Sequence, residues 1–357
     1  MRIAQVAPVV ETVPPERYGG TERVVSWLTE ELVRRGHDVT LFAAGSSRTS
    51  ATLVPVVPCA LRQGDQRYDT VSWRPFEEAL VHERAAEFDI IHSHIDEFAV
   101  AMRNRGVITP VVTTLHGRLD QEDMQQLLAS CHMPAVSISY AQRDPVPSAW
   151  WAANIYHGLP LDRYRPGPGD GEYVVFLGRM SPEKRPHVAI DIARRAGVRL
   201  VIAAKVDPAD RPYFDAVVRP RLSDPLVDFV GEVDEQAKER LLRHARALLF
   251  PILWPEPFGL AMIEALAYGT PVITRRCGST PEIVAHGRVG YVCDDDESMI
   301  DALTQVGRLD RGDCRRWVEE HFSVERMTTD YEQVYEMLAT DTTRSPSASD
   351  LSAHQAA

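Results

Sequence analysis

The chain has 357 residues, a formal charge of −12 and no lysine- or arginine-rich run. This length suffices for two domains with cores of their own, and the acidic balance argues against nucleic acid as the main partner. Five scattered cysteines without C-x-x-C spacing favour a reducing compartment and no metal framework. No stretch approaches the ~20 apolar residues of a membrane span, and the N-terminus reads as a strand rather than a signal peptide. We therefore expect a cytoplasmic protein without a transmembrane segment.

The first half alternates strands and helices. A strand over 3–7 precedes a helix over 21–35, with Thr21 as its predicted N-cap and Gly36 as its end. The loop between them holds Gly19–Gly20, which lacks the G-x-G-x-x-G dinucleotide pattern, so a plain flexible connection is an equal alternative. Further strands are predicted over 38–43, 52–57, 88–92, 109–115 and 135–139, and helices over 76–87, 98–105 and 121–131. This alternation predicts an α/β fold with a doubly wound parallel sheet.

Two histidines, His94 and His116, stand at the carboxyl ends of predicted strands. Open α/β sheets bind ligands at that edge. A zinc site that combines His92 with these two histidines is the less favoured interpretation, because no carboxylate stands at metal-ligand spacing.

Residues 159–171, LPLDRYRPGPGDG, are rich in proline and glycine and lack periodicity, which is typical of a linker. A second α/β run follows it. Its predicted strands cover 173–177, 199–204, 227–230, 247–253, 270–274 and 290–293, and its helices cover 188–195, 235–244, 258–268 and 280–285. The expected division is a Rossmann-like domain over 1–157, a linker over 158–171, a second Rossmann-like domain over 172–322 and a disordered polar tail over 340–357.

The stretch 254–271, WPEPFGLAMIEALAYGTP, joins a strand to a helix and contains two carboxylates. Prolines disfavour helix around Glu256, which is therefore expected in the loop before the helix. Glu264 is expected about two turns into the helix. The free N–H groups at such a helix start form a cradle for an anion. An ordinary crossover with two surface carboxylates is the plainer alternative.

Other charged groups near strand ends have plain alternatives as well. Arg179 and Lys184 follow the strand over 173–177, and a solvated basic loop is the competing interpretation. Lys205 ends a strand and is as easily a surface lysine. The acidic run over 294–297 superficially resembles a metal-binding D-x-D and is more simply a solvated loop.

Several motifs, in this order, resemble the retaining glycosyltransferases of family 4, which have the two-Rossmann architecture called GT-B. The motifs are Gly19-Gly20-Thr-Glu-Arg, Thr114-Leu-His116-Gly117, Tyr156-His-Gly158-Leu-Pro-Leu-Asp162, Gly178-Arg179 with Lys184, Gly231-Glu-Val233-Asp234, Glu256-Pro-Phe-Gly-Leu-Ala-Met-Ile-Glu264 and Cys277-Gly278-Ser-Thr-Pro-Glu282. Each motif alone is weak, whereas their order along nearly the whole chain is specific.

The resemblance implies an open cleft between two domains, with a nucleotide-sugar donor held mainly by the second. It implies transfer of the sugar to an acceptor hydroxyl with retained anomeric configuration, without a bound metal or other cofactor. UDP is the expected nucleotide, because UDP-sugars are the commonest donors in the family. A final helix over about 323–339 is expected to cross back onto the first domain.

The resemblance also assigns roles to individual residues. Arg179 and Lys184 would neutralise the departing diphosphate. Glu256 would face the transferred sugar, His116 would border it from the first domain, and Glu264 would hold the ribose hydroxyls. The remaining donor contacts would come from the backbone at both helix starts and from residues beside the nucleotide, namely Gly19, Gly20, Phe258, Gly259, Leu260, Lys205 and Val233.

The chain departs from the family at His157-Gly158, where Asn-Gly is common, so the role of position 157 is open. Residues 1–157 contain 14 arginines, no lysines and 19 acidic residues, a formal charge of −5. Binding to anionic lipid surfaces needs a basic face, so a soluble small-molecule or glycan acceptor is favoured. Two alternatives keep the same fold: a nucleotide-sugar epimerase, and a non-catalytic nucleotide-sugar-binding protein.

Overall fold

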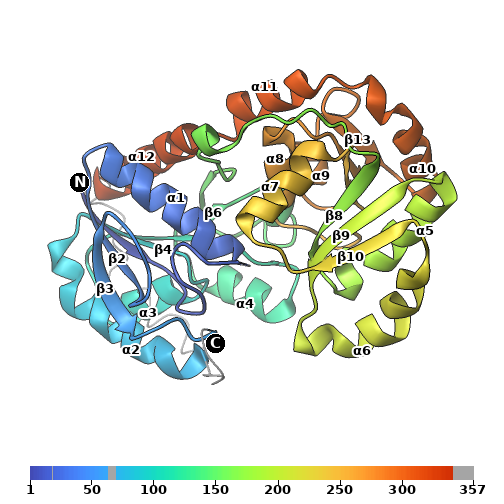
Figure 1. Ribbon diagram of the computed structural model, residues 1–357. Helices are drawn as coiled ribbons and strands as arrows, with labels where there is room; N and C mark the ends of the chain where they lie inside the picture. Colours follow the sequence, from blue (N-terminus) through green and yellow to red (C-terminus); the bar gives the residue numbers. More distant parts are fainter. Residues whose placement is uncertain (18, 63–69, 341–357) are drawn as a thin grey trace.

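The computed structural model describes residues 1–17, 19–62 and 70–340. Two α/β halves lie beside each other, each built on one parallel sheet (Figure 1). The predicted fold class is therefore confirmed. Residues 341–357 of the predicted tail lie outside the described residues. Among the residues that the structure describes, no helix has the length and apolar character that crossing a membrane requires.

The first sheet has seven strands in the order β3-β2-β1-β4-β5-β6-β7. All but the first residue of β1 are buried, as expected for a central strand covered on both faces. The strands are β1 (Arg2–Val6), β2 (Asp38–Ala44), β3 (Thr52–Val57), β4 (Ile90–Ser93), β5 (Val111–Thr114), β6 (Ala135–Ser137) and β7 (Trp151–Asn154). The helices of this half are α1 (Gly20–Arg34), α2 (Thr70–Arg84), α3 (Phe98–Asn104) and α4 (Glu122–Ser130).

The second sheet has six strands in the order β10-β9-β8-β11-β12-β13. They are β8 (Tyr173–Arg179), β9 (Arg199–Lys205), β10 (Val227–Gly231), β11 (Leu248–Phe250), β12 (Val272–Arg275) and β13 (Gly290–Cys293). The helices are α5 (Pro186–Ala196), the short α6 (Arg211–Tyr213), α7 (Glu235–His244), α8 (Leu260–Ala267), α9 (Thr280–Ile283), α10 (Asp296–Gln305) and α11 (Arg311–His321). Strand order reverses beside β1 and beside β8, and open sheets bind ligands outside the carboxyl ends of such strands.

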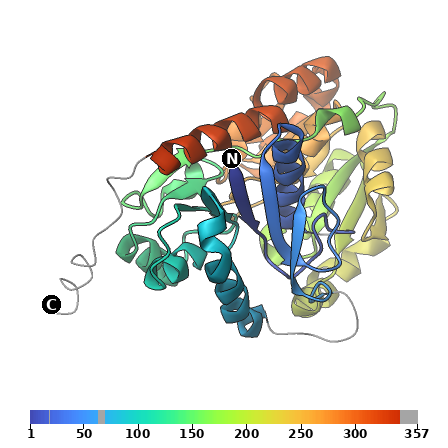
Figure 2. The same cartoon turned by 90° about the vertical axis from the view of Figure 1, so that its left-hand side faces the viewer.

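The last helix, α12 (Val324–Thr340), returns to the first half and lies against α1 (Figures 1 and 2). Its buried face contains Tyr331 and Tyr335, four residues apart on one side of the helix. The Tyr335 hydroxyl lies 2.7 Å from Nδ1 of His92. Ser323 caps the helix by accepting a bond from the Arg326 amide at 3.2 Å. The predicted return of the final helix is therefore confirmed.

Two helix starts differ from the sequence prediction, and glycine is the reason in both. Thr21 is not the N-cap of α1, which begins at Gly20, because Gly19 occupies the cap position with φ +157. Helix α8 begins at Leu260, because Gly259 takes the left-handed conformation with φ +85. Glu264 therefore lies little more than one turn into α8 rather than two.

The acidic run over 294–297 is not a solvated loop. Asp295 is the N-cap of α10, and its carboxylate accepts a bond from the Ser298 amide at 2.7 Å. Asp296 lies in the first helical turn, where it pairs with Arg275 at 2.9 Å. Aspartates are favoured at this position because they satisfy free amides and complement the helix dipole.

Candidate functional site

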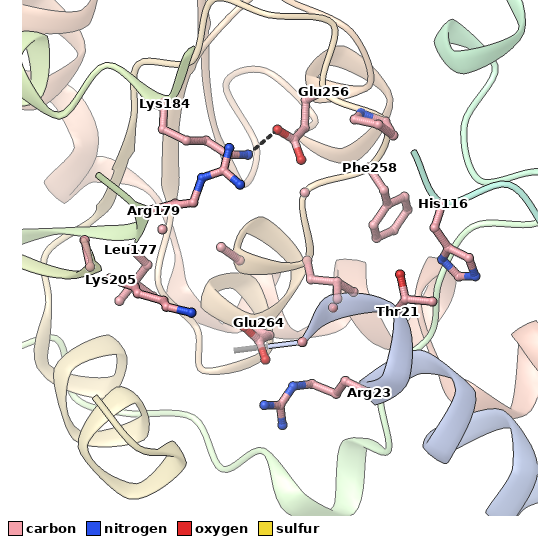
Figure 3. Close-up of a pocket in the computed structure, with 18 of the residues that line it drawn as sticks. Thr21, Arg23, His116, Leu177, Arg179, Lys184, Lys205, Glu256, Phe258 and Glu264 are labelled. Atoms are coloured by element: carbon pink, nitrogen blue, oxygen red, sulfur yellow. Dashed lines mark hydrogen bonds and ion pairs between the residues drawn. The ribbon is translucent and has the colours of Figure 1, made fainter. Parts of the chain in front are cut away.

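A pocket of about 470 Å³ lies between the two halves, at the carboxyl edges of both sheets. From the second half it receives the ends of β8 and β9, the loop after β11 and the start of α8. From the first half it receives the start of α1 and the loop after β5 (Figure 3). All the site residues predicted from the sequence line it, namely Gly19, Gly20, His116, Arg179, Lys184, Lys205, Val233, Glu256, Phe258, Gly259, Leu260 and Glu264.

An ion pair between Lys184 and Glu256 lies in this pocket (Figure 3). The Lys184 ammonium is 2.5 Å from Oε2 of Glu256, and the side chains are 14% and 10% exposed. The indole N–H of Trp254 donates to the same carboxylate oxygen at 2.6 Å. The ammonium also lies 4.9 Å from the centroid of the Trp254 ring. The pair is therefore oriented by fixed neighbours and partly withdrawn from water, where charges interact more strongly.

The loop that holds Glu256 is fastened by the segment after β12. The Ser279 amide donates to the Glu256 carbonyl at 3.0 Å, and the Ser279 hydroxyl donates to the Phe258 carbonyl at 2.8 Å. The thiol of Cys277 donates to the carbonyl of Trp254 at 2.9 Å. Gly278 has φ +54, and a Cβ there would lie 2.4 Å from the Glu256 nitrogen. Close backbone packing thus sets the position of this carboxylate.

Arg179 ends β8 and presents its guanidinium to the pocket. It forms ion pairs with Glu183 and with Asp210, whose Oδ2 lies 3.2 Å from Nε of Arg179. Its side chain remains 33% exposed. Lys205 ends the neighbouring strand β9 and lies 3.8 Å from Asp207. Both cations therefore border the pocket at the carboxyl edge of the second sheet.

Glu264 belongs to a charge network that joins the two halves. Its Oε1 lies 2.6 Å from the ammonium of Lys238, which is also 3.0 Å from Glu235. Glu235 in turn lies 3.0 Å from Arg23 of α1. Sequence reasoning missed Lys238 and Arg23. The available signal was composition, because the chain has only three lysines and all three line this pocket.

The starts of two helices face the pocket from opposite halves. Gly20 and Thr21 of α1 line it, as do Leu260 and Ala261 of α8. The first amides of a helix have no partner within the helix, and the helix dipole adds partial positive charge there. Together with Arg179 and Lys184, these amides make the pocket suited to an anion such as a diphosphate.

The histidines of the first half form a buried chain rather than the zinc site considered above. Nδ1 of His94 lies 2.9 Å from Nε2 of His116, and the His116 ring stacks on His157 at 5.2 Å between centroids. Nε2 of His92 lies 2.7 Å from the Thr114 hydroxyl. Within the described residues, no three His, Cys, Asp or Glu side chains are grouped to hold a metal.

Burial keeps these imidazoles neutral. It lowers the pKa of His92 and of His116 to about 3, and it places the pKa values of His94 and His157 well below the usual range. His157 also has a buried Nδ1 without a hydrogen-bond partner. At position 157, where the family commonly has asparagine, the neutral imidazole of His157 packs between the rings of His116 and Phe258.

Replacing His157 with asparagine is expected to reduce the acid sensitivity of the fold. Below about pH 6.5 the unfolded chain binds a proton at the His157 imidazole, whereas the folded chain does not. Proton binding therefore favours the unfolded chain, and the free energy of unfolding decreases as the pH falls. Between pH 6.5 and 5, the free energy of unfolding of H157N should fall less steeply by up to about 1.4 kcal/mol per pH unit. Urea denaturation at several pH values measures this slope. The exposed His82→Asn serves as control, and parallel curves for H157N and wild type would contradict the expectation.

A second pocket of about 280 Å³ opens beside the first and shares Thr21, His116 and Gly117 with it. Its other walls come from the loop after β1, from α2 and from the residues after β4. The amide of Gln142 donates to the carbonyls of Leu115 and Gly117 at 2.9 and 2.8 Å, which fixes the loop between the two pockets.

Comparisons with known proteins agree on one family. Residues 18–159 match the family described as Glycosyltransferase Family 4, and residues 163–321 match the family described as Glycosyl transferases group 1. The chain is similar to a D-inositol 3-phosphate glycosyltransferase of Mycolicibacterium smegmatis, with 26% identity over 82% of this chain and 79% of the relative. It is also similar to a phosphatidyl-myo-inositol mannosyltransferase of Mycobacterium tuberculosis, with 26% identity over 87% of this chain and 86% of the relative.

Solved structures share the fold. The crystal structure of AviGT4, a glycosyltransferase involved in avilamycin A biosynthesis, superposes with a TM-score of 0.71 and 24% identity over 95% of this chain and 98% of the other. HepE of Anabaena, solved in complex with UDP and glucose, superposes with a TM-score of 0.74 and 18% identity over 95% and 100% of the two chains.

Proposed function

Because the chain belongs to glycosyltransferase family 4 and has the GT-B fold, we propose that it moves a sugar from a UDP-sugar to an acceptor hydroxyl with retained anomeric configuration. The observation that carries this proposal is the pocket between the halves, in which Lys184 and Arg179 meet the starts of α1 and α8. A departing nucleoside diphosphate needs this combination of fixed cations and N–H dipoles. HepE was solved with UDP and glucose, which supports UDP as the nucleotide.

In this mechanism the bond between the anomeric carbon and the phosphate oxygen breaks, and its electron pair leaves with the diphosphate. Lys184 and Arg179 neutralise the developing charge, so that the step needs no divalent metal ion. Lys184 is the better placed of the two, because Glu256 pairs with its ammonium and the Trp254 ring lies 4.9 Å from it in the pocket. The acceptor hydroxyl forms the new bond on the same face of the sugar and passes its proton to the departing phosphate oxygen.

Glu256 and His116 flank the place left for the sugar. The Glu256 carboxylate lies beside Lys184, where it can accept a bond from a sugar hydroxyl or stabilise positive charge at the anomeric carbon. His116 borders the pocket from the other half. Its neutral ring can accept or donate a hydrogen bond without adding charge that would oppose the cationic transition state.

Donor turnover in the absence of acceptor tests the proposed function directly. Retaining transferases of this kind should hydrolyse their donor slowly, because water can replace the acceptor. Incubation with labelled UDP-sugars in buffer with a chelator should release UDP and free sugar. NMR time courses separate this reaction from epimerisation, which would give a new UDP-sugar. Silence across the common UDP-, GDP- and ADP-sugars would contradict the proposal.

Replacing Glu264 with alanine is expected to weaken UDP binding by about 10- to 100-fold, the value of a lost hydrogen bond to a charged group. Glu264 is 5% exposed, lines the pocket and is held by Lys238 at 2.6 Å, which supports the proposal that its carboxylate binds the ribose hydroxyls. Calorimetric titration of UDP measures the effect. Glu239→Ala removes a carboxylate from the nearby α7 that is paired with Arg243 and should leave the affinity unchanged. An unchanged affinity in E264A would remove Glu264 from the site.

A further inference from the structure

The second pocket is acidic. Three carboxylates line it, Glu77 from α2 and Asp96 and Glu97 after β4. The one guanidinium among its described lining residues belongs to Arg74, which forms an ion pair with Glu97. Its two imidazoles, His94 and His116, are neutral because burial lowers their pKa values. Arg74 is also close enough for its charge to act on Glu77 and Asp96, so among the described lining residues one guanidinium serves all three carboxyls.

Glu77 is the more unusual of the two. Its side chain is 3% exposed, and its buried Oε1 has no hydrogen-bond partner. A buried polar atom without a partner is costly, so such atoms in folded proteins call for an explanation such as a missing ligand. Burial raises the pKa of Glu77 to about 8 and that of Asp96 to about 6, and the charge of Arg74 opposes these shifts only in part.

We infer that this second pocket receives the acceptor and that the acceptor is a polyhydroxylated ring that bears a protonated amine, such as an amino sugar or aminocyclitol. The inference rests on the proposed glycosyltransferase function. An ammonium group supplies three donors and a positive charge, which suits Oε1 of Glu77 and the carboxylate of Asp96. A bound ammonium would favour the ionised form of both carboxyls, whereas a neutral polyol has no charge that offsets their burial.

The acceptor of this chain would thus differ in charge from the phosphorylated inositol named for one of its relatives. A phosphate in this pocket would face Glu77 and Asp96, while Arg74 is already engaged by Glu97. Like charges at close range cost binding energy and select against such a ligand. The charge of the whole first half also disfavours a phosphorylated acceptor, because residues 1–157 have a formal charge of −5.

The second pocket is also correctly placed for transfer. Thr21, His116 and Gly117 line both pockets, so they stand between the acceptor and the donor sugar. An amine held by Glu77 and Asp96 would leave the other side of the ring facing His116. Glu77 and Asp96 would act here as specificity-determining residues, with no part in bond breaking.

The test compares four probes in the presence of UDP, by ligand-observed NMR titration. They are 2-deoxystreptamine, its di-N-acetyl derivative, myo-inositol and myo-inositol 1-phosphate. We expect 2-deoxystreptamine to bind at least about tenfold more tightly than its acetylated form, as for a hydrogen-bonded charge pair, and the phosphate to bind most weakly. Equal or tighter binding of the acetylated or phosphorylated probe would overturn the inference, as would binding of none of the four while UDP binds.

Two single variants assign the preference to the pocket. Glu77→Gln and Asp96→Asn keep the side-chain volume and remove the charge, and each should reduce the preference for the amine to within about threefold. Glu83→Gln, an exposed change on the same helix as Glu77, should leave it intact. A preference unchanged in both pocket variants would overturn the assignment. UDP titrated into the same samples reports on the proposed function separately, so that failure of donor binding is distinguishable from failure of amine recognition.

Discussion

Replacing Lys184 with alanine is expected to lower the rate of sugar transfer by about 10²- to 10³-fold, the usual cost of removing one preorganised group that stabilises transition-state charge. The Lys184 ammonium is only 14% exposed and is positioned by Glu256 and the Trp254 ring. Its removal takes away a fixed cation and leaves the Glu256 carboxylate bonded to the indole N–H of Trp254. Steady-state kinetics with the best UDP-sugar, with kcat and KM measured separately, gives the effect.

The relative changes in kcat and KM show whether the Lys184 charge acts in the transition state or only in donor binding. If Lys184 acts on the departing diphosphate, kcat should fall more than KM rises, because the charge grows in the transition state. Lys184→Arg should recover part of the rate, since it keeps the charge with a different shape. Arg194→Ala removes an exposed cation from α5 and should have no effect. A loss of affinity with unchanged kcat would show that Lys184 only binds the donor.

Replacing Gly278 with alanine is expected to reduce activity by about 100-fold, although residue 278 does not line the pocket. A Cβ at this position would lie 2.4 Å from the nitrogen and 2.5 Å from the carbonyl oxygen of Glu256. Neither backbone atom can turn away as a flexible side chain would, so the loop has to move. Misplacement of a reacting group by about 1 Å can cost ~10² in rate. Kinetic assays and thermal denaturation of the same preparation separate a loss of activity in the folded enzyme from a loss of stability.

Gly287→Ala is the matched control for Gly278→Ala. Gly287 also has positive φ, +77, but a Cβ there would meet nothing within 4 Å. G287A should lose about 1–2 kcal/mol of stability, the cost of a side chain in the left-handed region, and G278A should lose at least as much because of the clash. Only G278A should lose activity beyond that explained by the unfolded fraction. Equal activities of the two folded variants would mean that the position of Glu256 is unimportant for transfer.

Much of the site followed from the order of strands and loops along the chain. In a parallel sheet the carboxyl ends of neighbouring strands meet at one edge, so Arg179, Lys205 and Glu256 could be predicted to share a pocket before their contacts were known. The pattern of apolar residues along the sequence also predicted most elements within a few positions. The helix over 235–244 and the strands over 52–57 and 290–293 agree at both ends.

Elements without a clear apolar pattern were missed. Each residue of β7 (Trp151–Asn154) is only partly buried, so the strand shows no alternation. The acidic run over 294–297 resembles a loop, although the capping bond of Asp295 makes its second half the start of α10. Local composition cannot separate these cases, because a cap and a loop use the same residues.

Contacts between distant residues were beyond sequence reasoning. Lys238 and Glu264 are 26 positions apart and pair only because α7 and α8 present them to the same pocket. Glu77 and Asp96 come from different elements, and each looks like an ordinary surface carboxylate in the sequence. Which charge remains unmatched depends on packing, which a single sequence does not reveal.

Calorimetric titration of UDP and of uridine, both with a chelator present, tests most directly the claim that protein groups alone neutralise the diphosphate. UDP should bind at least about 100-fold more tightly than uridine, as expected when two or more charge-assisted bonds are added, and K184A should lose about tenfold of this difference, as expected for one such bond. Equal affinities of UDP and uridine, or a UDP affinity that appears only when a divalent ion is restored, would contradict the account.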